Sequence, residues 1–169
     1  GIDVVLLEQF GPGHTRGSSH GATRIFRLAY PIERYVRLAQ AAMRQWRALE
    51  DDCGETLLEI TGGIDIGSPA AVAPIASALA SCRAETEFVS TSDAATRWPG
   101  IMIPDGNQVL FSPDSGRVWA DRTVAALQRQ CVAHGAEVRF DEPVMAIDAA
   151  GGVVRTERET CEAAANGLP

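Results

Sequence analysis

Residues 14–27 hold the densest group of side chains that could do chemistry. They include two glycines, two serines, two threonines, two histidines and three arginines. Glycines permit tight turns, and hydroxyls beside backbone N–H groups can hold an anion. Arg24 and Arg27 add fixed positive charge, and the Ile25-Phe26 pair between them favours an extended segment. In an extended segment, these two arginines point to opposite faces.

An acidic residue, Glu8, directly follows the apolar run at residues 4–7. That run is typical of a parallel strand buried on both faces. In dinucleotide-binding α/β folds, an acid at the end of the second strand accepts hydrogen bonds from ribose hydroxyls. Glu8 therefore predicts a nucleotide site, and the alternative is a surface acid that ends a strand.

Several motifs resemble the monomeric sarcosine oxidase and N-methyltryptophan oxidase family of flavoenzymes. They begin with residues 5–8, His14 and the run Gly-Ser-Ser-His-Gly-Ala-Thr-Arg-Ile-Phe-Arg at residues 17–27. Further motifs in the family's order are Tyr30 with a long helix after it, Thr61-Gly62-Gly63, Arg97-Trp98-Pro99-Gly100 and Pro113-Asp114-Ser115-Gly116. The resemblance covers nearly all of the chain, to about Ile147.

The resemblance implies an α/β fold: an incomplete Rossmann-like FAD-binding domain with an inserted α+β substrate-domain segment. It places residues 1–57 and 117–169 in the FAD-binding domain and residues 58–116 in the substrate domain. In the intact enzyme, FAD would oxidise a small secondary amino acid such as an N-methyl amino acid, and oxygen would yield hydrogen peroxide. Two alternatives stay open. One is another member of the glycine and D-amino-acid oxidase superfamily, and the other is an inactive remnant or interaction module.

The same resemblance implies roles for individual residues. Arg24 would be catalytic, because its charge stabilises negative charge that develops on the flavin and then on oxygen. Arg27 would pair with the substrate carboxylate, and its alternative is a surface salt bridge. His20 matches an active-site histidine, and its alternative is a loop histidine. The implied cofactor-binding residues are Glu8, Gln9, Ser18, Ser19, Thr23, Arg24 and Val144; ordinary turn or core positions are the alternative.

Three departures from the family pattern limit what this chain should do alone. A glycine fingerprint normally precedes the ribose acid by about 20 residues, but seven residues precede Glu8 here. None of the four cysteines matches the family's flavin-attachment cysteine, and none of the fifteen basic residues is lysine. We therefore expect FAD to be absent or weakly bound and turnover to fail. We also expect the strand at residues 4–7 to leave an unpaired edge that invites self-association.

Composition and charge indicate which classes of binding partner and which cellular compartment to expect. A net charge of −7 and a pI near 4.9 argue against nucleic acid or an anionic membrane as partner. No apolar run reaches membrane-spanning length, and no signal-peptide pattern is present, so we expect a cytoplasmic protein that meets an amino-acid substrate and oxygen. The four scattered cysteines indicate reduced thiols, and His14 and His134 are read as structural, so no metal site is predicted.

Periodicity predicts the elements that position these residues. The first helix runs from about Tyr30 to Gly54, with a solvated charged face that includes Glu50. A second covers 69–82, a third ends near Trp98 with Ser92 or Asp93 as its cap, and a fourth is capped by Asp121. Strands are expected within 57–67 and at 88–89, 109–111, 136–140, 144–147 and 153–156.

Overall fold

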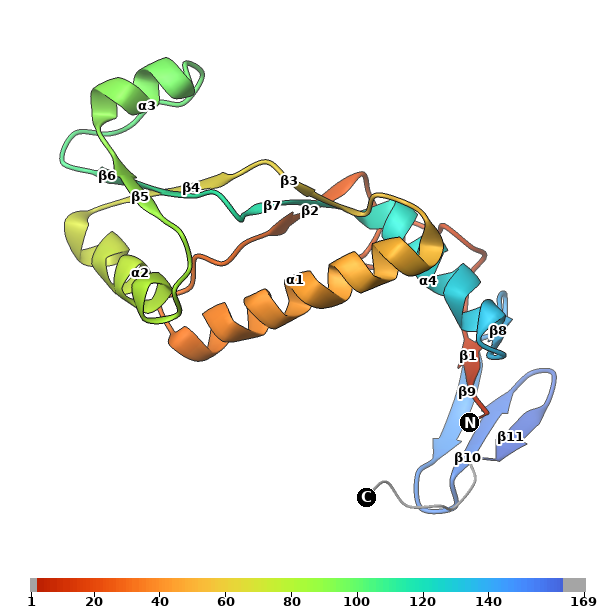
Figure 1. Cartoon of the computed structure of the whole chain (residues 1–169). Helices are drawn as coiled ribbons and strands as arrows, with labels where there is room; N and C mark the ends of the chain where they lie inside the picture. Colours follow the sequence, from red (N-terminus) through yellow and green to blue (C-terminus); the bar gives the residue numbers. More distant parts are fainter. Residues whose placement is uncertain (1–2, 163–169) are drawn as a thin grey trace. The chain divides into compact units, whose positions relative to one another are not determined.

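The computed structural model describes residues 3–162, and the chain divides into two compact units (Figure 1). The first joins Gly1–Gly21 to Asp121–Pro169, and the second is Ala22–Ala120. Both mix helices and strands, which confirms the predicted α/β class. Compactness does not identify what each unit binds. The assignment of residues 58–116 to a substrate domain therefore stays a prediction.

The elements follow the predicted order closely. They are β1 (Val5–Leu7), β2 (Thr23–Phe26), α1 (Glu33–Cys53), β3 (Leu58–Ile60), β4 (Gly63–Gly67), α2 (Pro69–Ser81), β5 (Glu87–Val89), α3 (Thr91–Arg97), β6 (Gln108–Ser112), β7 (Gly116–Trp119), α4 (Ala120–Ala133), β8 (Glu137–Arg139), β9 (Val144–Asp148), β10 (Val153–Thr156) and β11 (Thr160–Glu162). Within the described part of the chain, no helix has the length and apolar character needed to cross a membrane.

In the first unit, β1 pairs in parallel with β8, and Leu6 lies opposite Val138. Burial of β1 on both faces, as its sequence alone suggests, is wrong for this chain. Val4, Val5 and Leu6 remain 51%, 43% and 40% exposed. The reason is that β8 is the single strand that pairs with β1 among residues 3–162. Among residues 3–162, β1 thus pairs along one edge alone, and its apolar side chains stay exposed.

A network of charged side chains links β8 to the antiparallel meander β9-β10-β11 in the same unit. Arg139 pairs with Glu137 (2.7 Å) and Glu159. Glu142 is buried and accepts a hydrogen bond from Thr156 Oγ1 at 2.8 Å. Since a buried carboxylate is costly without partners, this network fixes how the meander follows β8.

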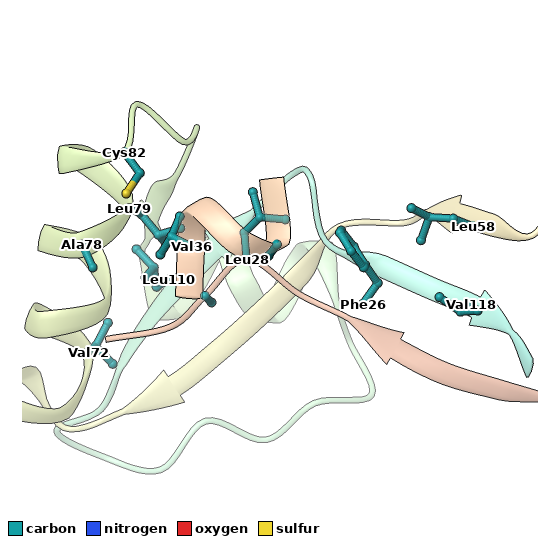
Figure 2. Close-up of a cluster of buried hydrophobic side chains, with 12 residues drawn as sticks. Phe26, Leu28, Val36, Leu58, Val72, Ala78, Leu79, Cys82, Leu110 and Val118 are labelled. Carbon is teal, nitrogen blue, oxygen red and sulfur yellow. The ribbon is translucent and has the colours of Figure 1, made fainter. Parts of the chain in front are cut away.

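The second unit contains two three-stranded antiparallel sheets, β2-β7-β3 and β4-β6-β5. Its largest core cluster joins α1, α2 and strands from both sheets. In Figure 2, Leu79 of α2 lies beside Val36 of α1 and Leu110 of β6, and all three are fully buried. This core fixes β2 and the residues after it, and so the backbone that carries Arg24 and Arg27.

Helix α1, the long orange helix in Figure 1, ends where the sequence predicts. Gly54 is left-handed (φ 69°), and its N–H donates to Glu50 O at 2.8 Å. The predicted solvated face is wrong at Glu50, whose side chain is only 12% exposed. Its Oε1 accepts the backbone N–H groups of Leu57 and Leu58, each at 2.7 Å. Glu50 therefore joins α1 to the start of β3.

Two predicted helix caps are corrected by the structure. Ser90, rather than Ser92 or Asp93, caps α3, because its side chain accepts the Asp93 N–H at 3.1 Å. Asp121 lies inside the first turn of α4 and not before it, since the helix begins at Ala120. The cap of α3 thus lies two positions before Ser92 and three before Asp93, and Asp121 lies two positions after the capping position of α4.

The turn at residues 113–116 brings β7 against β3 at unusually close range. Gly116 lies opposite both Phe26 of β2 and Ile60 of β3. A Cβ at this position would overlap Glu59 O and stand 2.9 Å from Ile60 Cα. Glycine is therefore required here because two backbones approach each other where any side chain would intrude.

The second unit begins and ends at neighbouring residues. The Ala120 N–H donates to Ala22 O at 3.1 Å, next to the Thr23–Trp119 pair of the β2-β7 ladder. On the first unit's side of these positions, the Gly21 N–H donates to Asp121 Oδ1 at 2.8 Å. In each unit, the two residues at which the chain passes to the other unit are thus joined by a hydrogen bond.

Candidate functional site

A pocket of about 510 Å³ lies in the first unit, where the chain leaves β1. Glu8, Ser19 and His20, three of the predicted site residues, line it. The remaining walls come from the loop after Glu8 and from the first turns of α4: Pro12, Gly13, His14, Gly17, Asp121, Val124, Ala125 and Gln128. The end of β1 and the serine–histidine stretch therefore share one concave surface.

Glu8 is held in place by two hydrogen-bond donors to one of its oxygens. Oε1 lies 2.9 Å from Phe10 N and 3.3 Å from His14 Nε2. The Phe10 N–H is the main reason that the pKa of the Glu8 carboxyl lies below its usual value; partial burial opposes this effect and His14 adds to it. The carboxylate is thus ionised at neutral pH, as an acceptor of ribose hydroxyls must be.

The loop that carries Ser19 and His20 is fixed by its own backbone and by α4. His20 Nδ1 bonds Gly17 O, and Asp121 Oδ1 accepts the Gly21 N–H. Sequence reasoning missed Asp121 because it lies 100 positions from Gly21. No local pattern signals such a contact, so only the fold reveals that α4 positions this loop.

Three other predicted cofactor residues of the first unit do not line this pocket. Gln9 and Ser18 are exposed, and neither is among the lining residues. Val144 opens β9, opposite Thr156, and is 42% exposed. Their cofactor roles remain predictions that rest on the family resemblance.

Thr23 and Arg24 belong to β2 in the second unit. Residues 23–26 form a strand, which confirms the extended segment predicted from Ile25-Phe26. Arg24 is exposed, and its Nη1 donates to Thr23 O at 2.8 Å. Arg24 pairs with Val118 of β7, the central strand of its sheet. Because β7 also pairs with β3 on its other side, the backbone at Arg24 is firmly held. The charge of Arg24 is thus carried on a rigid element.

Arg27 follows β2 and lines a second pocket of about 430 Å³ with Phe26, Tyr30 and residues of α1 from Tyr35 to Trp46. Its guanidinium carbon lies 4.8 Å from the centre of the Tyr30 ring. Within residues 3–162, no carboxylate lies within ion-pair distance of Arg27, so the salt-bridge alternative receives no support there. A stacked guanidinium keeps its edge N–H groups available for a planar anion.

Asp65 is the acid whose titration Arg27 affects. It lies in β4 opposite the fully buried Leu110, so both side chains share the inner face of their sheet. Burial raises the pKa of the Asp65 carboxyl, and the Arg27 charge offsets part of that rise. A partly buried carboxylate at an edge strand destabilises the folded unit relative to a neutral side chain.

We expect Asp65→Asn to raise the free energy of unfolding by about 0.5 kcal/mol at pH 7. Since the folded-state pKa is raised, the charged carboxyl costs stability at neutral pH, and this cost disappears as the pH falls through the folded value towards the unfolded one near 3.9. Urea unfolding at pH 7 and pH 4 measures the difference. Trp46, Trp98 and Trp119 all lie in the second unit, so tryptophan fluorescence reports on it.

The exposed Asp105 of the same unit provides the matched control for this change. Asp105→Asn should leave stability unchanged at both pH values. Equal effects of the two substitutions, or a gain in Asp65→Asn that grows as the pH falls, would contradict the burial argument.

Comparison with known proteins assigns the class. Residues 1–167 match the family model DAO, FAD dependent oxidoreductase, so the chain belongs to that family. It is 32% identical over 148 residues to the monomeric sarcosine oxidase of Bacillus sp. (strain NS-129), covering 85% of this chain and 38% of that protein. It is 33% identical over 147 residues to the peroxisomal sarcosine oxidase of Homo sapiens, covering 86% and 38%. The chain thus spans about two-fifths of the length of these relatives.

Solved structures agree with this fold. The open form of NikD, an amino acid oxidase of nikkomycin biosynthesis, superposes with a TM-score of 0.80 at 28% identity, covering 95% of this chain and 43% of NikD. Glycine oxidase from Geobacillus kaustophilus superposes with a TM-score of 0.74 at 19% identity, covering 95% and 46%. The second likeness concerns the fold alone, which confirms the predicted architecture as part of a larger one.

Proposed function

We propose that this chain supplies the ribose-binding acid and the substrate-carboxylate arginine of an FAD-dependent oxidase of secondary amines such as N-methyl amino acids. The observation that carries the proposal is the pocket that brings Glu8, Ser19 and His20 together in a member of the FAD dependent oxidoreductase family. Relatives named sarcosine oxidase and N-methyl-L-tryptophan oxidase support the choice of amine.

The donors and acceptors present fit the nucleotide part of FAD. Glu8 can offer Oε2 to ribose hydroxyls, because Phe10 N and His14 Nε2 both lie beside Oε1. The Ser19 hydroxyl and the His20 ring line the same pocket and can contact polar groups of the cofactor. When bound, FAD would supply the two-electron acceptor for amine oxidation, with oxygen as the final acceptor and hydrogen peroxide as product.

The arginines have separate tasks in this proposal. Arg24 holds a fixed positive charge on β2, which favours negative charge developing close to it. Arg27 binds the substrate carboxylate through its planar fork while Tyr30 supports the guanidinium from one side. His20, whose Nδ1 bonds Gly17 O, lines the same pocket, and its imidazole is a group that can transfer protons near neutral pH.

The proposal predicts that Arg27→Ala raises KM for an N-methyl amino acid by about tenfold or more, because a charge-assisted pair worth about 1.5–3 kcal/mol is lost. The measurement is peroxide formation by the intact enzyme that contains this chain, with sarcosine as substrate. Arg44→Ala, an exposed arginine of α1, is the matched control and should leave KM unchanged.

The substrate panel decides between the proposal and its alternatives. Sarcosine and N-methyltryptophan are tested beside glycine, D-alanine and proline. Oxidation of glycine or D-alanine without oxidation of the N-methyl amino acids would assign the chain to another branch of the superfamily. Flavin-free protein that oxidises none of the five would favour the inactive remnant.

A further inference from the structure

We propose that His14 is a positioning residue for the Glu8 carboxylate, which it orients so that Oε2 faces the ribose hydroxyls. The inference rests on the proposed function, because it assigns a role to His14 only if Glu8 binds the nucleotide. His14 was read from the sequence as structural, and it lies in the loop that forms one wall of the pocket.

The hydrogen bonds around the ring define which nitrogen carries the proton. The Arg16 backbone N–H points at His14 Nδ1, with the two nitrogens 3.2 Å apart. A backbone N–H can only donate, so Nδ1 must be the acceptor and must lack a proton. The neutral ring therefore carries its hydrogen on Nε2, which faces Glu8 Oε1 at 3.3 Å. His14 is a donor to the carboxylate in its uncharged form.

Aromatic and cationic neighbours hold the ring in this orientation. The centres of the Phe10 and His14 rings are 5.1 Å apart, with an angle of 57° between their planes. The Arg16 guanidinium carbon lies 4.8 Å from the centre of the Phe10 ring. Phe10 also donates its backbone N–H to Glu8 Oε1. The same short loop thus fixes the imidazole and the carboxylate together.

In this arrangement, the two oxygens of the Glu8 carboxylate have different roles: Oε1 binds protein donors and Oε2 is the acceptor for the ligand. Oε1 accepts both the Phe10 N–H and the His14 Nε2–H, which occupies its two lone pairs. The Gln9 N–H also interacts with this carboxylate, and it is the weakest of the contacts that lower the pKa of Glu8. Since the rotation of the carboxylate is fixed by the two donors on Oε1, Oε2 is presented to the pocket without the ordering cost that a freely rotating side chain would incur on binding. The other titratable side chains of the pocket are His20 and Asp121.

Two substitutions separate donation from ring packing. His14→Phe keeps an aromatic ring beside Phe10 but has no donor for Glu8. His14→Gln loses the ring but can place an amide N–H where Nε2 stands. If His14 acts through Glu8, the Glu8 carboxyl, followed by ¹³C NMR in the full chain, should titrate at higher pH in His14→Phe than in the wild type, and His14→Gln should restore most of the difference. A purely structural histidine predicts the opposite order, because the glutamine removes the ring.

Ligand binding provides the second arm, with adenosine at millimolar concentration as the probe and Glu8 chemical shifts as the readout. We expect His14→Phe to weaken binding about fivefold, because the Glu8 side chain must then be ordered when the ligand binds, and Glu8→Gln to weaken it at least as much. Weakening by Glu8→Gln with unchanged binding in His14→Phe would overturn the role of His14 alone. No response of Glu8 to adenosine in the wild type would overturn the ribose assignment itself.

The ring nitrogens of the unmodified chain give a test that needs no variant. ¹⁵N shifts of His14 should show a protonated Nε2 and an unprotonated Nδ1 at neutral pH. The reverse tautomer would overturn the proposal even if both substitutions prevented folding, because a ring with its proton on Nδ1 cannot donate to Glu8.

Discussion

Replacing Gly116 by alanine is expected to lower the free energy of unfolding of the second unit by at least about 3 kcal/mol, which is among the larger effects of a single substitution. The added methyl group would meet Glu59 O and Ile60 Cα, both backbone atoms of the neighbouring strand. Backbone atoms in a ladder cannot move aside as a flexible side chain can. Relief therefore requires β3 and β7 to separate, which breaks the pairing that holds β2.

Urea unfolding followed by tryptophan fluorescence measures this loss, with Gly100→Ala as the control. A Cβ on Gly100 meets no atom within 4 Å, so alanine should be tolerated there within about 0.5 kcal/mol. If Gly116→Ala unfolds at the same urea concentration as Gly100→Ala, the argument that β3 and β7 leave no room for a Cβ at position 116 is contradicted.

The second large effect is expected for Glu50→Ala, at about 3 kcal/mol. The substitution removes the acceptor of the Leu57 and Leu58 N–H groups and breaks the 2.5 Å pair with Arg47. Leu57 and Leu58 are almost completely buried, so water cannot replace the lost acceptor without opening the core. The cost is therefore that of buried donors left unpaired and not that of a surface salt bridge.

Glu50→Gln separates the two contributions. The amide oxygen can still accept both N–H groups, so we expect a smaller loss of about 1 kcal/mol from the missing charge. Burial alone would raise the pKa of Glu50, but the Leu58, Arg47 and Leu57 hydrogen bonds outweigh it and lower the pKa. The charged form therefore stabilises the fold above the ordinary glutamate value near 4.3, and this contribution is lost as the pH falls through the lowered value. A gap between wild type and Glu50→Gln that persists unchanged at pH 3 would contradict this account.

Local features of the fold could be predicted from the sequence because their causes lie within a few residues of each other. The apolar repeat and Gly54 predicted the course and end of α1, and the Ile25-Phe26 pair predicted the extended course of β2. The grouping of Glu8, Ser19 and His20 could also be predicted, because these residues are close in the chain and the family resemblance assigns all three to the flavin site.

The long-range contacts could not be predicted, since no periodicity records them. The sequence places Glu50 on the charged face of α1, but in the fold its carboxylate accepts backbone N–H groups at the start of β3. Asp121 looked like a cap and is instead an acceptor for the distant Gly21 N–H. The Glu8–His14 pair was within reach of sequence reasoning, but a histidine in a polar loop gives no sign of which nitrogen is protonated or which partner it selects.

The hydrogen bond between Ala22 and Ala120 brings the two ends of the second unit together. This unit of nearly a hundred residues is therefore inserted into the first unit at a single place. Segments whose ends meet are the ones that tolerate insertion, deletion and exchange, because the host fold has only a short gap to close. Gly21 and Asp121 close that gap with a bond of their own. Residues 22–120 can therefore be varied or exchanged as one insert at a single place, while β1 and β8 of the first unit keep their register.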